Sequence, residues 1–394
     1  MTKLIFTEEY CQPQNLHPFT LIRHIQDLRV GILTIREKWE KRLGLTSFDK
    51  WEGYYLDDAR SIKIDKNIGA DTFLMIHANV LPTPSLVSQI KKLSPGEFLT
   101  AKGEGAIAYK FSAKEVIGLH KIKMRRSIAY SEKVDVLHYP WQLFQLNDQE
   151  IRSDFKLLTA RKKSKPVSRT NKLTSPGDVF VEAGVKMEHC IINASTGPVY
   201  IGKNAAIMEG SVIRGPFAMG EGSLVKAGTR IYGATTLGPY CLAGGEIKNS
   251  ILMGYSNKAH DGYLGDSVVG EWCNLGAGTS NSNLKNNCGD VTYFVHADKK
   301  EMSAGNKGGL LMGDYSKAAI NTSFNTGTVV GVCSNVFAQG LTPKYIPHFS
   351  WGCDGITRYK LDNAIADIDK WKQLKGASIT EKEKKILSDI YKKF

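Results

Sequence analysis

The sequence has no apolar run long enough to span a bilayer, although 42% of its 394 residues are hydrophobic. A transmembrane helix needs about 20 consecutive, mainly apolar residues. The opening residues, MTKLIFTEEY, also lack the hydrophobic core of a signal peptide. We therefore expect a cytoplasmic protein with no membrane partner.

Cysteines are few and irregularly placed. The chain has seven, with no CxxC pair and no repeated spacing. An odd number in such a pattern suits reduced thiols better than a disulfide framework or a zinc cluster. We expect most of them to be small buried side chains, and we expect no metal site built from them.

Nucleic-acid-binding motifs are also missing, although the net charge is +13. No RNP, helix-turn-helix or zinc-finger pattern accompanies the charge, which is dispersed or lies in segments such as RKKSK and the lysine-rich end. A cleft that binds an anionic small molecule, such as a phosphate or nucleotide, needs positive charge equally. We favour a small-molecule substrate and expect no nucleic-acid partner.

The chain does contain a long repeat with a period of six. From residue 201 every sixth residue is apolar, and Gly is frequent next to these positions. Neither a helix nor a flat strand gives a strict period of six, whereas a coil of short strands joined by tight turns does. The repeat predicts a left-handed parallel β-helix with three strands per rung and one inward side chain per strand. The inward series is Ile201, Ile207, Ile213, Met219, Val225, Ile231, Leu237 and Ala243.

The period slips after Ala243 and then resumes twice. We expect the slip to be a short insertion at a corner, and the stretch from Ser280 to Leu311 to be a loop inserted into the coil, a place for ligand or subunit contacts. The resumed inward series is Ile251, Asn257, Tyr263, Val269 and Leu275, followed by Met312, Ala318, Phe324, Val330 and Val336.

Strand and helix patterns alternate before the repeat. The segments KLIFT, TFLMIHANV and GAIAYKF are typical of strands, and Ile35 to Leu43 and LPTPSLVSQIKKL of helices. This order predicts an α/β domain with a mainly parallel sheet. We expect that domain at 1–158, a basic linker at 159–177, the β-helix at 178–350, and a helical segment at 351–394 with two amphipathic helices.

LHPFTLIRHIQDLRVGILTI resembles a degraded signature of sugar-1-phosphate nucleotidyltransferases, and HANVLPTP resembles the strand end that carries their metal-binding Asp. The resemblance implies a Rossmann-like nucleotidyltransferase domain that uses UTP and Mg²⁺. The chain departs from it: no Gly-rich loop follows KLIFT, His24 and Ile25 stand where a Pro-Lys pair is expected, and Asn79 stands where the Asp is expected. A neutral amide is a poorer Mg²⁺ ligand than a carboxylate. Arg23, Arg29 and Asn79 are the candidate nucleotide-binding residues.

The coil resembles a second family. The stretch from Arg230 to Asn283 is similar, nearly residue for residue in places, to the acetyltransferase half of the bifunctional UDP-N-acetylglucosamine pyrophosphorylase/glucosamine-1-phosphate N-acetyltransferase. The whole chain looks like an alternative bacterial branch of that family with a shortened N-terminal domain. The resemblance implies a homotrimer that uses acetyl-CoA, with the distal segment AAINTSFNTGTVVGVCSN holding the coenzyme. The lysine expected shortly after NLKNN is missing, so phosphate or donor binding is expected to differ in detail.

By this resemblance His260, in NKAHDGYLGD, is the catalytic base. An imidazole that titrates near neutrality is suited to deprotonating an amino sugar. Arg230 and Lys248 match cationic ligands of the sugar phosphate. Their spacing of eighteen residues is one full rung, which predicts that they stack on one face of adjacent rungs.

Five further positions match the family's site. Tyr263 and Asn274 match residues that hydrogen-bond the sugar, although Tyr263 also falls on the predicted inward series and has packing as an alternative role. Asn283 matches an Asn near the acceptor amine, and Gly276 and Ala277 match the backbone turn beside the thioester. For Gly276, corner geometry is a second explanation.

These inferences predict a sugar-nucleotide biosynthesis transferase. The β-helix would N-acetylate glucosamine-1-phosphate or a related amino sugar, and the first domain would be a sugar-1-phosphate nucleotidyltransferase. Two alternatives stay open: an acyltransferase for another sugar nucleotide with a non-catalytic first domain, and a nucleotidyltransferase whose β-helix only trimerises. A γ-type carbonic anhydrase is set aside, because the chain has no HxxxxH pair.

Overall fold

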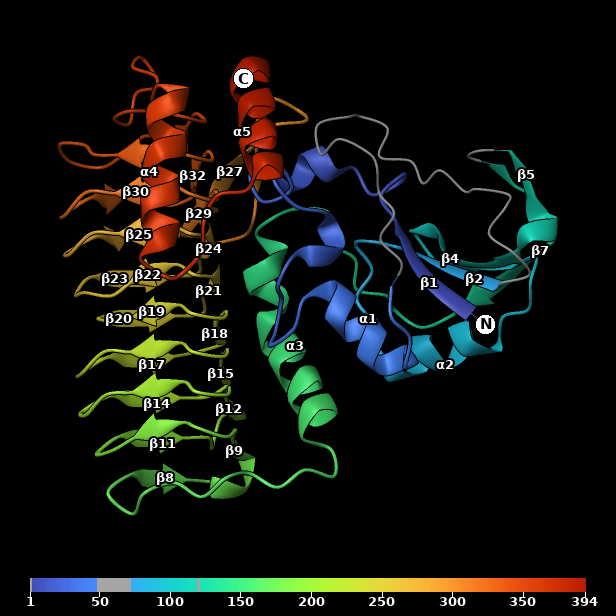
Figure 1. Cartoon of the computed structure of the whole chain (residues 1–394), viewed down its shortest axis with the longest axis horizontal. Helices are drawn as coiled ribbons and strands as arrows, with labels where there is room; N and C mark the ends of the chain where they lie inside the picture. The colour runs from blue at the N-terminus through green and yellow to red at the C-terminus, as the bar shows by residue number, and fades with distance from the viewer. Residues whose placement is uncertain (1, 48–71, 119–120) are drawn as a thin grey trace. The chain divides into compact units, whose positions relative to one another are not determined.

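The computed structural model describes residues 2–47, 72–118 and 121–394 (Figure 1). The chain forms two compact units. The N-terminal unit comprises Met1–Leu16, Arg23–Leu28 and Leu33–His138, and the coil unit comprises His17–Ile22, Arg29–Ile32 and Tyr139–Phe394. The predicted domain boundaries at 158, 177 and 350 stay predictions. None of the described helices is both long and apolar enough to cross a membrane.

The N-terminal unit is built on a five-stranded sheet in the order β1-β2-β4-β3-β7. Its strands are β1 (Thr2–Thr7), β2 (Thr72–His77), β3 (Glu97–Ala101), β4 (Gly105–Ser112) and β7 (Arg126–Tyr130). β1 pairs with β2, and β3 with β7, in parallel, but β4 is antiparallel to both of its neighbours. The α/β prediction is confirmed. Four of the five strands run in the same direction, as expected for a mainly parallel sheet, and the exception is β4, which follows β3 as a hairpin strand inserted between the two parallel pairs.

Local capping fixes the two helices of this unit. α1 spans Ile35–Leu43, as predicted, and begins with a capping box between Thr34 and Glu37. α2 spans Pro84–Lys92, with Pro84 in its first turn and the Thr83 side chain accepting a backbone hydrogen bond. The remaining elements are short: η1 (Pro13–Leu16), η2 (Ile25–Asp27), η3 (Ala113–Glu115), β5 (Val116–Gly118) and β6 (Lys121–Ile122).

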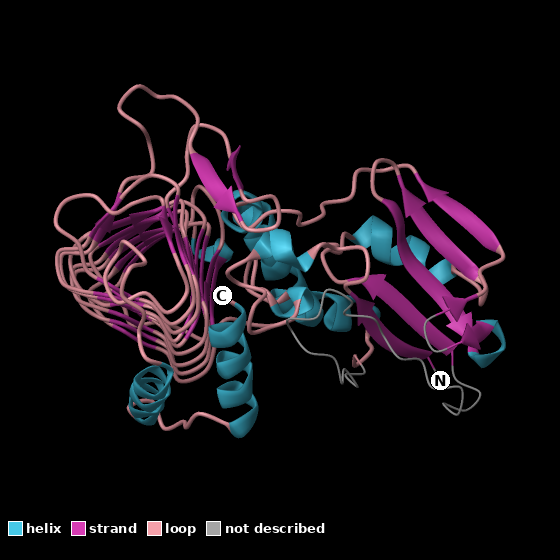
Figure 2. Cartoon of the chain, turned by 90° about the horizontal axis from the view of Figure 1, so that it is seen from above, coloured by secondary structure: helices cyan, strands magenta, loops and turns pink. Residues whose placement is uncertain are grey.

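The coil unit contains three sheets of short strands, and every pairing within them is parallel. Figure 1 shows the strands stacked rung upon rung, and Figure 2 looks along the stack at its three walls. The predicted left-handed parallel β-helix is confirmed.

The eight-stranded sheet consists of β10 (Lys186–Met187), β13 (Ala206–Ile207), β16 (Leu224–Val225), β19 (Leu242–Ala243), β22 (Asn257–Lys258), β25 (Asn274–Leu275), β30 (Lys317–Ala318) and β33 (Asn335–Val336). The six-stranded sheet consists of β8 (Lys172–Thr174), β11 (Ile191–Asn193), β14 (Val212–Arg214), β17 (Arg230–Tyr232), β20 (Glu246–Lys248) and β23 (Tyr263–Gly265). The nine-stranded sheet consists of β9 (Val179–Val181), β12 (Val199–Ile201), β15 (Phe217–Met219), β18 (Thr235–Leu237), β21 (Ile251–Gly254), β24 (Val268–Glu271), β29 (Leu310–Met312), β32 (Thr328–Val330) and β34 (Tyr345–Ile346).

The interior of the coil is an aliphatic stack. All eight residues of the predicted series from Ile201 to Ala243 are buried and belong to one core cluster, as does the distal series from Met312 to Val336. The predicted period is confirmed over these stretches.

The inward register between these stretches differs from the prediction. Ile231 pairs with Ile247 and Ala243 with Lys258, so these rungs are two to three residues shorter than the rung in which Ile213 pairs with Ile231. Asn257 and Tyr263 were expected to point inward and do not. The inward residues here are Ile247, Leu252, Lys258, Leu264, Val269 and Leu275.

Other elements of this unit decorate the coil. The predicted insertion contains β26 (Ser280–Asn281), which pairs with β31 (Ser323–Phe324), and a hairpin of β27 (Thr292–Val295) and β28 (Lys300–Ser303). α3 (Gln142–Thr159) lies against the nine-stranded sheet, where Asn147 Nδ2 donates to the carbonyl of Ala234 at 2.7 Å. The two predicted C-terminal helices are α4 (Leu361–Gln373) and α5 (Glu381–Lys393), and η4 (Pro176–Asp178) precedes the coil.

Candidate functional site

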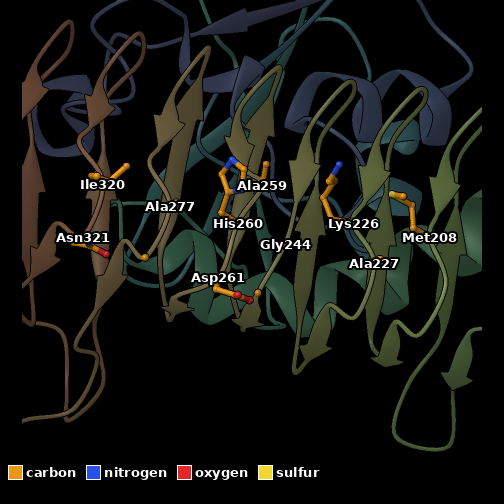
Figure 3. Close-up of a pocket in the computed structure, with 12 residues that line it drawn as sticks. Met208, Lys226, Ala227, Gly244, Ala259, His260, Asp261, Ala277, Ile320 and Asn321 are labelled. Atoms are coloured by element: carbon orange, nitrogen blue, oxygen red, sulfur yellow. The ribbon is translucent and has the colours of Figure 1, made fainter.

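A groove of about 640 Å³ runs along one corner of the coil. This corner, which we call the groove corner, comprises the loops that follow each strand of the eight-stranded sheet. The groove therefore collects residues from several successive rungs (Figure 3). Its lining is Met208, Lys226, Ala227, Gly244, Gly245, Ala259, His260, Asp261, Ala277, Gly278, Ile320 and Asn321.

His260 lies in this groove and is exposed to solvent. It occupies the loop between β22 and β23, and Figure 3 shows its ring directed away from the coil. The preceding rung makes room for this loop: a Cβ on Gly244 would lie 2.4 Å from the carbonyl oxygen of Ala259, so only glycine fits there. The imidazole is thus open to a ligand in the groove, and its catalytic role stays a prediction.

Arg230 and Lys248 do not stack as predicted. In the shortened rung Arg230 pairs with Glu246, and Lys248 pairs with Tyr232. Arg230 Nη2 lies 3.6 Å from Glu246 Oε2, and the Tyr232 hydroxyl donates to Glu246 Oε1, which raises the pKa of Tyr232 to about 12. Lys248 Nζ lies 5.7 Å from the centre of the Tyr232 ring. Both cations lie on adjacent strands of the six-stranded sheet, but neither lines the groove.

The cation that does line the groove is Lys226, which the sequence analysis missed. It makes no ion pair with any residue that the structure describes, and Figure 3 shows its side chain directed outward like that of His260. Lys226 directly follows the inward Val225, but a lysine at a corner cannot be told from any exposed charge until the groove is known. Such a cation can bind a phosphate in the groove.

Tyr263 and Asn283 lie together. The Asn283 side-chain amide is 3.3 Å from the Tyr263 hydroxyl, and it donates to Asp266 Oδ2 at 2.5 Å. Asp266, which the sequence analysis missed, is 3% exposed and accepts a second amide hydrogen bond from Asn249 Nδ2 at 2.6 Å. Burial raises the pKa of Tyr263. Because Tyr263 points outward, the packing role that its predicted inward position allowed is removed.

Asn274 lies apart from this pair. It belongs to β25 of the eight-stranded sheet and pairs with Asn257 and Lys317, whereas Tyr263 belongs to the six-stranded sheet. Gly276 is required by geometry, since a Cβ there would lie 2.6 Å from the backbone nitrogen of Ile320. Ala277 lines the groove close to His260.

The three candidate nucleotide-binding residues are not brought together in one unit. Asn79 is 4% exposed in the N-terminal unit; its Oδ1 accepts from Cys11 Sγ at 3.2 Å and its Nδ2 donates to the Leu137 carbonyl at 3.1 Å. Arg23 is half-buried in the same unit, but Arg29 belongs to the coil unit, where its Nε donates to the Met253 carbonyl at 3.2 Å.

The loop after β1 holds a buried carboxylate in place of a Gly-rich nest. Glu8 is 2% exposed, accepts a hydrogen bond from the backbone N–H of Ile25 and lies 3.2 Å from His24 Nδ1. Both Glu8 and Asn79 are occupied by protein partners, and among the described residues no three His, Cys, Asp or Glu side chains are grouped to hold a metal ion. In this arrangement neither Glu8 nor Asn79 is free to bind Mg²⁺.

Residues 4–163 match the family model described as sugar nucleotidyl transferase. The resemblance to GlmU-like sugar nucleotidyl transferases is confirmed. The chain is 38% identical over 86 residues to the bifunctional protein GlmU of Methanocaldococcus jannaschii, which covers 22% of this chain and 21% of that protein. It is 29% identical over 172 residues to GlmU of Cyanothece sp., which covers 38% of each chain.

A third relative is the bifunctional sugar-1-phosphate nucleotidylyltransferase/acetyltransferase of Sulfurisphaera tokodaii, 33% identical over 93 residues, or 23% of each chain. These matches span about one fifth to two fifths of the relatives' length. Among solved structures, a UDP-N-acetylglucosamine acyltransferase crystal structure covers 49% of this chain and 70% of its own, at 13% identity and a TM-score of 0.22. That score is too low to add to the argument.

The geometry singles out one place in the coil. The groove corner presents the exposed imidazole of His260 and, two rungs away, the ammonium of Lys226, with backbone turns between them. Such a set can bind an anionic substrate and accept a proton. The N-terminal unit differs: there the side chains of Glu8 and Asn79 are bonded to neighbouring residues of the same unit.

Proposed function

We propose that the coil unit transfers an acetyl group from acetyl-CoA to the amine of glucosamine-1-phosphate or a related amino-sugar phosphate. The observation that carries this proposal is the exposed imidazole of His260 in an open groove that also contains Lys226. The similarity to bifunctional GlmU proteins supports the reaction class.

In the proposed reaction the acceptor amine attacks the thioester carbonyl, the C–S bond breaks, and the thiolate of coenzyme A leaves. His260 takes the proton that the amine loses and returns it to the departing sulfur, so that coenzyme A leaves as a thiol. The turn at Gly276 and Ala277 would border the thioester. A tetrahedral oxyanion forms on the way and needs hydrogen-bond donors, for which backbone N–H groups of this turn are the candidates.

Charge on the coil would orient the acceptor. Lys226 in the groove, with Arg230 and Lys248 on the adjoining six-stranded sheet, would bind the sugar phosphate. Glu246 holds part of the Arg230 charge, so we expect Lys226 to contribute more to phosphate binding. Tyr263, on the same sheet, and Asn283, in the inserted loop beside it, would contact the sugar.

We further propose that the protein is a homotrimer, as the GlmU-like resemblance implies. Ile191 and Val212, on adjacent strands of the six-stranded sheet, are 44% and 41% exposed, which supports contact between copies through this face. Replacing Val212 by Asp should shift the trimer toward monomer in analytical ultracentrifugation. A wild-type monomer at micromolar concentration would contradict this part of the proposal.

A second candidate function is nucleotidyl transfer by the N-terminal unit. The family match over residues 4–163 favours it, whereas the occupied side chains of Glu8 and Asn79 do not. We propose that this unit binds the nucleotide part of a sugar nucleotide. Pyrophosphate release on adding UTP and Mg²⁺ to N-acetylglucosamine-1-phosphate would instead assign it a catalytic role.

The acetyl-transfer proposal is tested by measuring thiol release from acetyl-CoA with glucosamine-1-phosphate as acceptor. His260→Asn should lower kcat by about 10²- to 10⁴-fold, the usual contribution of a general base. His189→Asn is a matched control, because His189 is also exposed and also stands two residues after an inward side chain, Met187, at the groove corner. Equal activity of the His260 variant and wild type would refute the assignment of the base.

A further inference from the structure

The interior of the coil contains one inward residue whose chemistry conflicts with its surroundings. Lys258 is fully buried, and its Cα pairs with that of the inward Ala243. Transferring an ammonium group from water to an apolar interior is costly unless the group is well hydrogen-bonded. Desolvation lowers the pKa of Lys258 to about 8. A residue this unfavourable for stability calls for another reason to be there.

The Lys258 ammonium binds the loop that carries His260. Its Nζ donates hydrogen bonds to the backbone carbonyl oxygens of His260 and Asp261, the latter at 3.2 Å. Both residues line the groove. Lys258 therefore reaches from inside the coil to the inner side of the loop, whose outer side presents the imidazole.

Other rungs fasten the groove corner differently. Ser211 Oγ donates to the carbonyl of Met208 at 2.8 Å, and Thr322 Oγ1 donates to the carbonyl of Ala319 at 2.8 Å. In each case the hydroxyl stands four residues after the inward side chain. At the His260 loop the corresponding residue is Gly262, which has no hydroxyl. At this rung the loop is instead fastened by the buried ammonium, through the carbonyls of His260 and Asp261.

The backbone around the loop is also tightly constrained. Gly262 has a φ of +116°, and a Cβ on it would lie 2.1 Å from the carbonyl oxygen of Thr279. A Cβ on Gly245, one rung earlier, would lie 2.8 Å from the carbonyl oxygen of His260. The loop is enclosed between these rungs, so the direction of its carbonyl groups is fixed. The Lys258 ammonium donates hydrogen bonds to two of these carbonyl groups.

We infer that Lys258 is a positioning residue: its ammonium orients the 259–261 backbone so that the His260 imidazole faces the groove. This inference rests on the proposed function for its catalytic consequence. Lys258 touches neither the groove nor a reacting atom, and it acts through the His260 backbone.

The test replaces Lys258 by Met, which fills the interior with a similar unbranched chain but donates no hydrogen bond. We expect kcat for acetyl transfer to fall about 10- to 100-fold, because a displacement of about 1 Å is costly in catalysis, with the KM for acetyl-CoA changed less than threefold. The His260 imidazole, followed by NMR and assigned with His260→Asn, should titrate at a different pH than in wild type. Leu264→Met, at the inward position of the next strand, is the control and should leave both readouts unchanged.

A merely structural Lys258 would give a different pattern, namely a lowered melting temperature with unchanged kcat and unchanged His260 titration in the folded protein. That result overturns the inference. If wild type transfers no acetyl group, the proposed function fails, but the NMR titration still decides whether Lys258 orients His260. If the Met variant does not fold, Lys258→Gln, which keeps a shorter N–H donor, takes its place; an unchanged His260 titration there also overturns the inference.

Discussion

Asp266 is the buried carboxylate on which the proposed sugar-binding pair depends. Its two oxygens accept amide hydrogen bonds from Asn249 at 2.6 Å and Asn283 at 2.5 Å, and its backbone carbonyl accepts from the N–H of Gly309 at 2.9 Å. It thereby joins the coil to both ends of the inserted loop. We predict that Asp266→Asn destabilises the coil and weakens acceptor binding.

The magnitude follows from counting hydrogen bonds. An Asn at 266 keeps one acceptor oxygen but turns an NH₂ group toward one of the two amide donors, so one bond is lost and two donors face each other. Hydrogen bonds to charged groups contribute about 1.5–3 kcal/mol, and an unsatisfied buried group costs about 1–3 kcal/mol. We therefore expect the free energy of unfolding to fall by about 2–4 kcal/mol. Freed from Asp266, Asn283 no longer holds its position beside Tyr263.

The assay combines urea denaturation, followed by circular dichroism, with acetyl-transfer kinetics. We expect a lower urea midpoint for Asp266→Asn and a KM for glucosamine-1-phosphate raised about tenfold. Asp298→Asn is the control: Asp298 is exposed in the same inserted loop and lies 3.6 Å from Lys300, and an exposed ion pair contributes little. If Asp266→Asn matches the control in both measurements, the carboxylate does not hold the loop and the reasoning is wrong.

Three further predictions concern the coil and its thiols. Burial lowers the pKa of Lys258 to about 8 in the folded protein, below its usual value of 10.5, so its charge costs stability below pH 8 and the cost disappears as the pH rises through 10.5. Between pH 7 and pH 11, wild type should therefore gain on the order of 3 kcal/mol of unfolding free energy relative to Lys258→Met, measured by urea titration. Gly262→Ala should lower the melting temperature strongly, whereas Gly228→Ala, with no atom within 4 Å of the new Cβ, should lower it less. Cys288 is exposed and should react rapidly with a thiol reagent, whereas Cys241, whose burial raises its pKa to about 11, should react only on unfolding.

The β-helix could be predicted because the apolar residues that fill its interior recur at fixed intervals in the sequence. Nearly every inward position is apolar, and the period of six holds as long as each rung has the same length. The predicted inward register is wrong after Ala243, because the rungs there are shorter than eighteen residues. The error is hard to see in the sequence, because an apolar residue also occupies the neighbouring position. Ile251 is buried too, but on the outer side of the nine-stranded sheet, where α3 lies. Two apolar neighbours, Ile251 and Leu252, left the sequence ambiguous about which one points inward.

The same slip limited the prediction of the site. His260 could be located because the sequence around it resembles the family's loop motif. Recognising that motif does not depend on which neighbouring residues point into the coil. The predicted stacking of Arg230 and Lys248 depended on a rung of eighteen residues, and the rung is shorter. Lys226 was missed because a lysine at a corner looks like any exposed charge until the groove is known. In the N-terminal unit, the order of β4 in the sheet depends on long-range pairing that strand patterns do not encode.

The register error also concealed the feature with the clearest functional implication. In the predicted register Asn257 was the one polar inward residue, and a polar residue at an insertion needs no explanation. In the observed register the inward residue is Lys258, whose ammonium is fully buried and bonded to the loop of His260. A strict repeat of aliphatic side chains tolerates such a residue only if something other than packing maintains it. Lys258 lies beneath the one exposed imidazole of the groove. The same lysine therefore accounts for the stability lost in the interior and for the position of the loop on which the proposed chemistry depends.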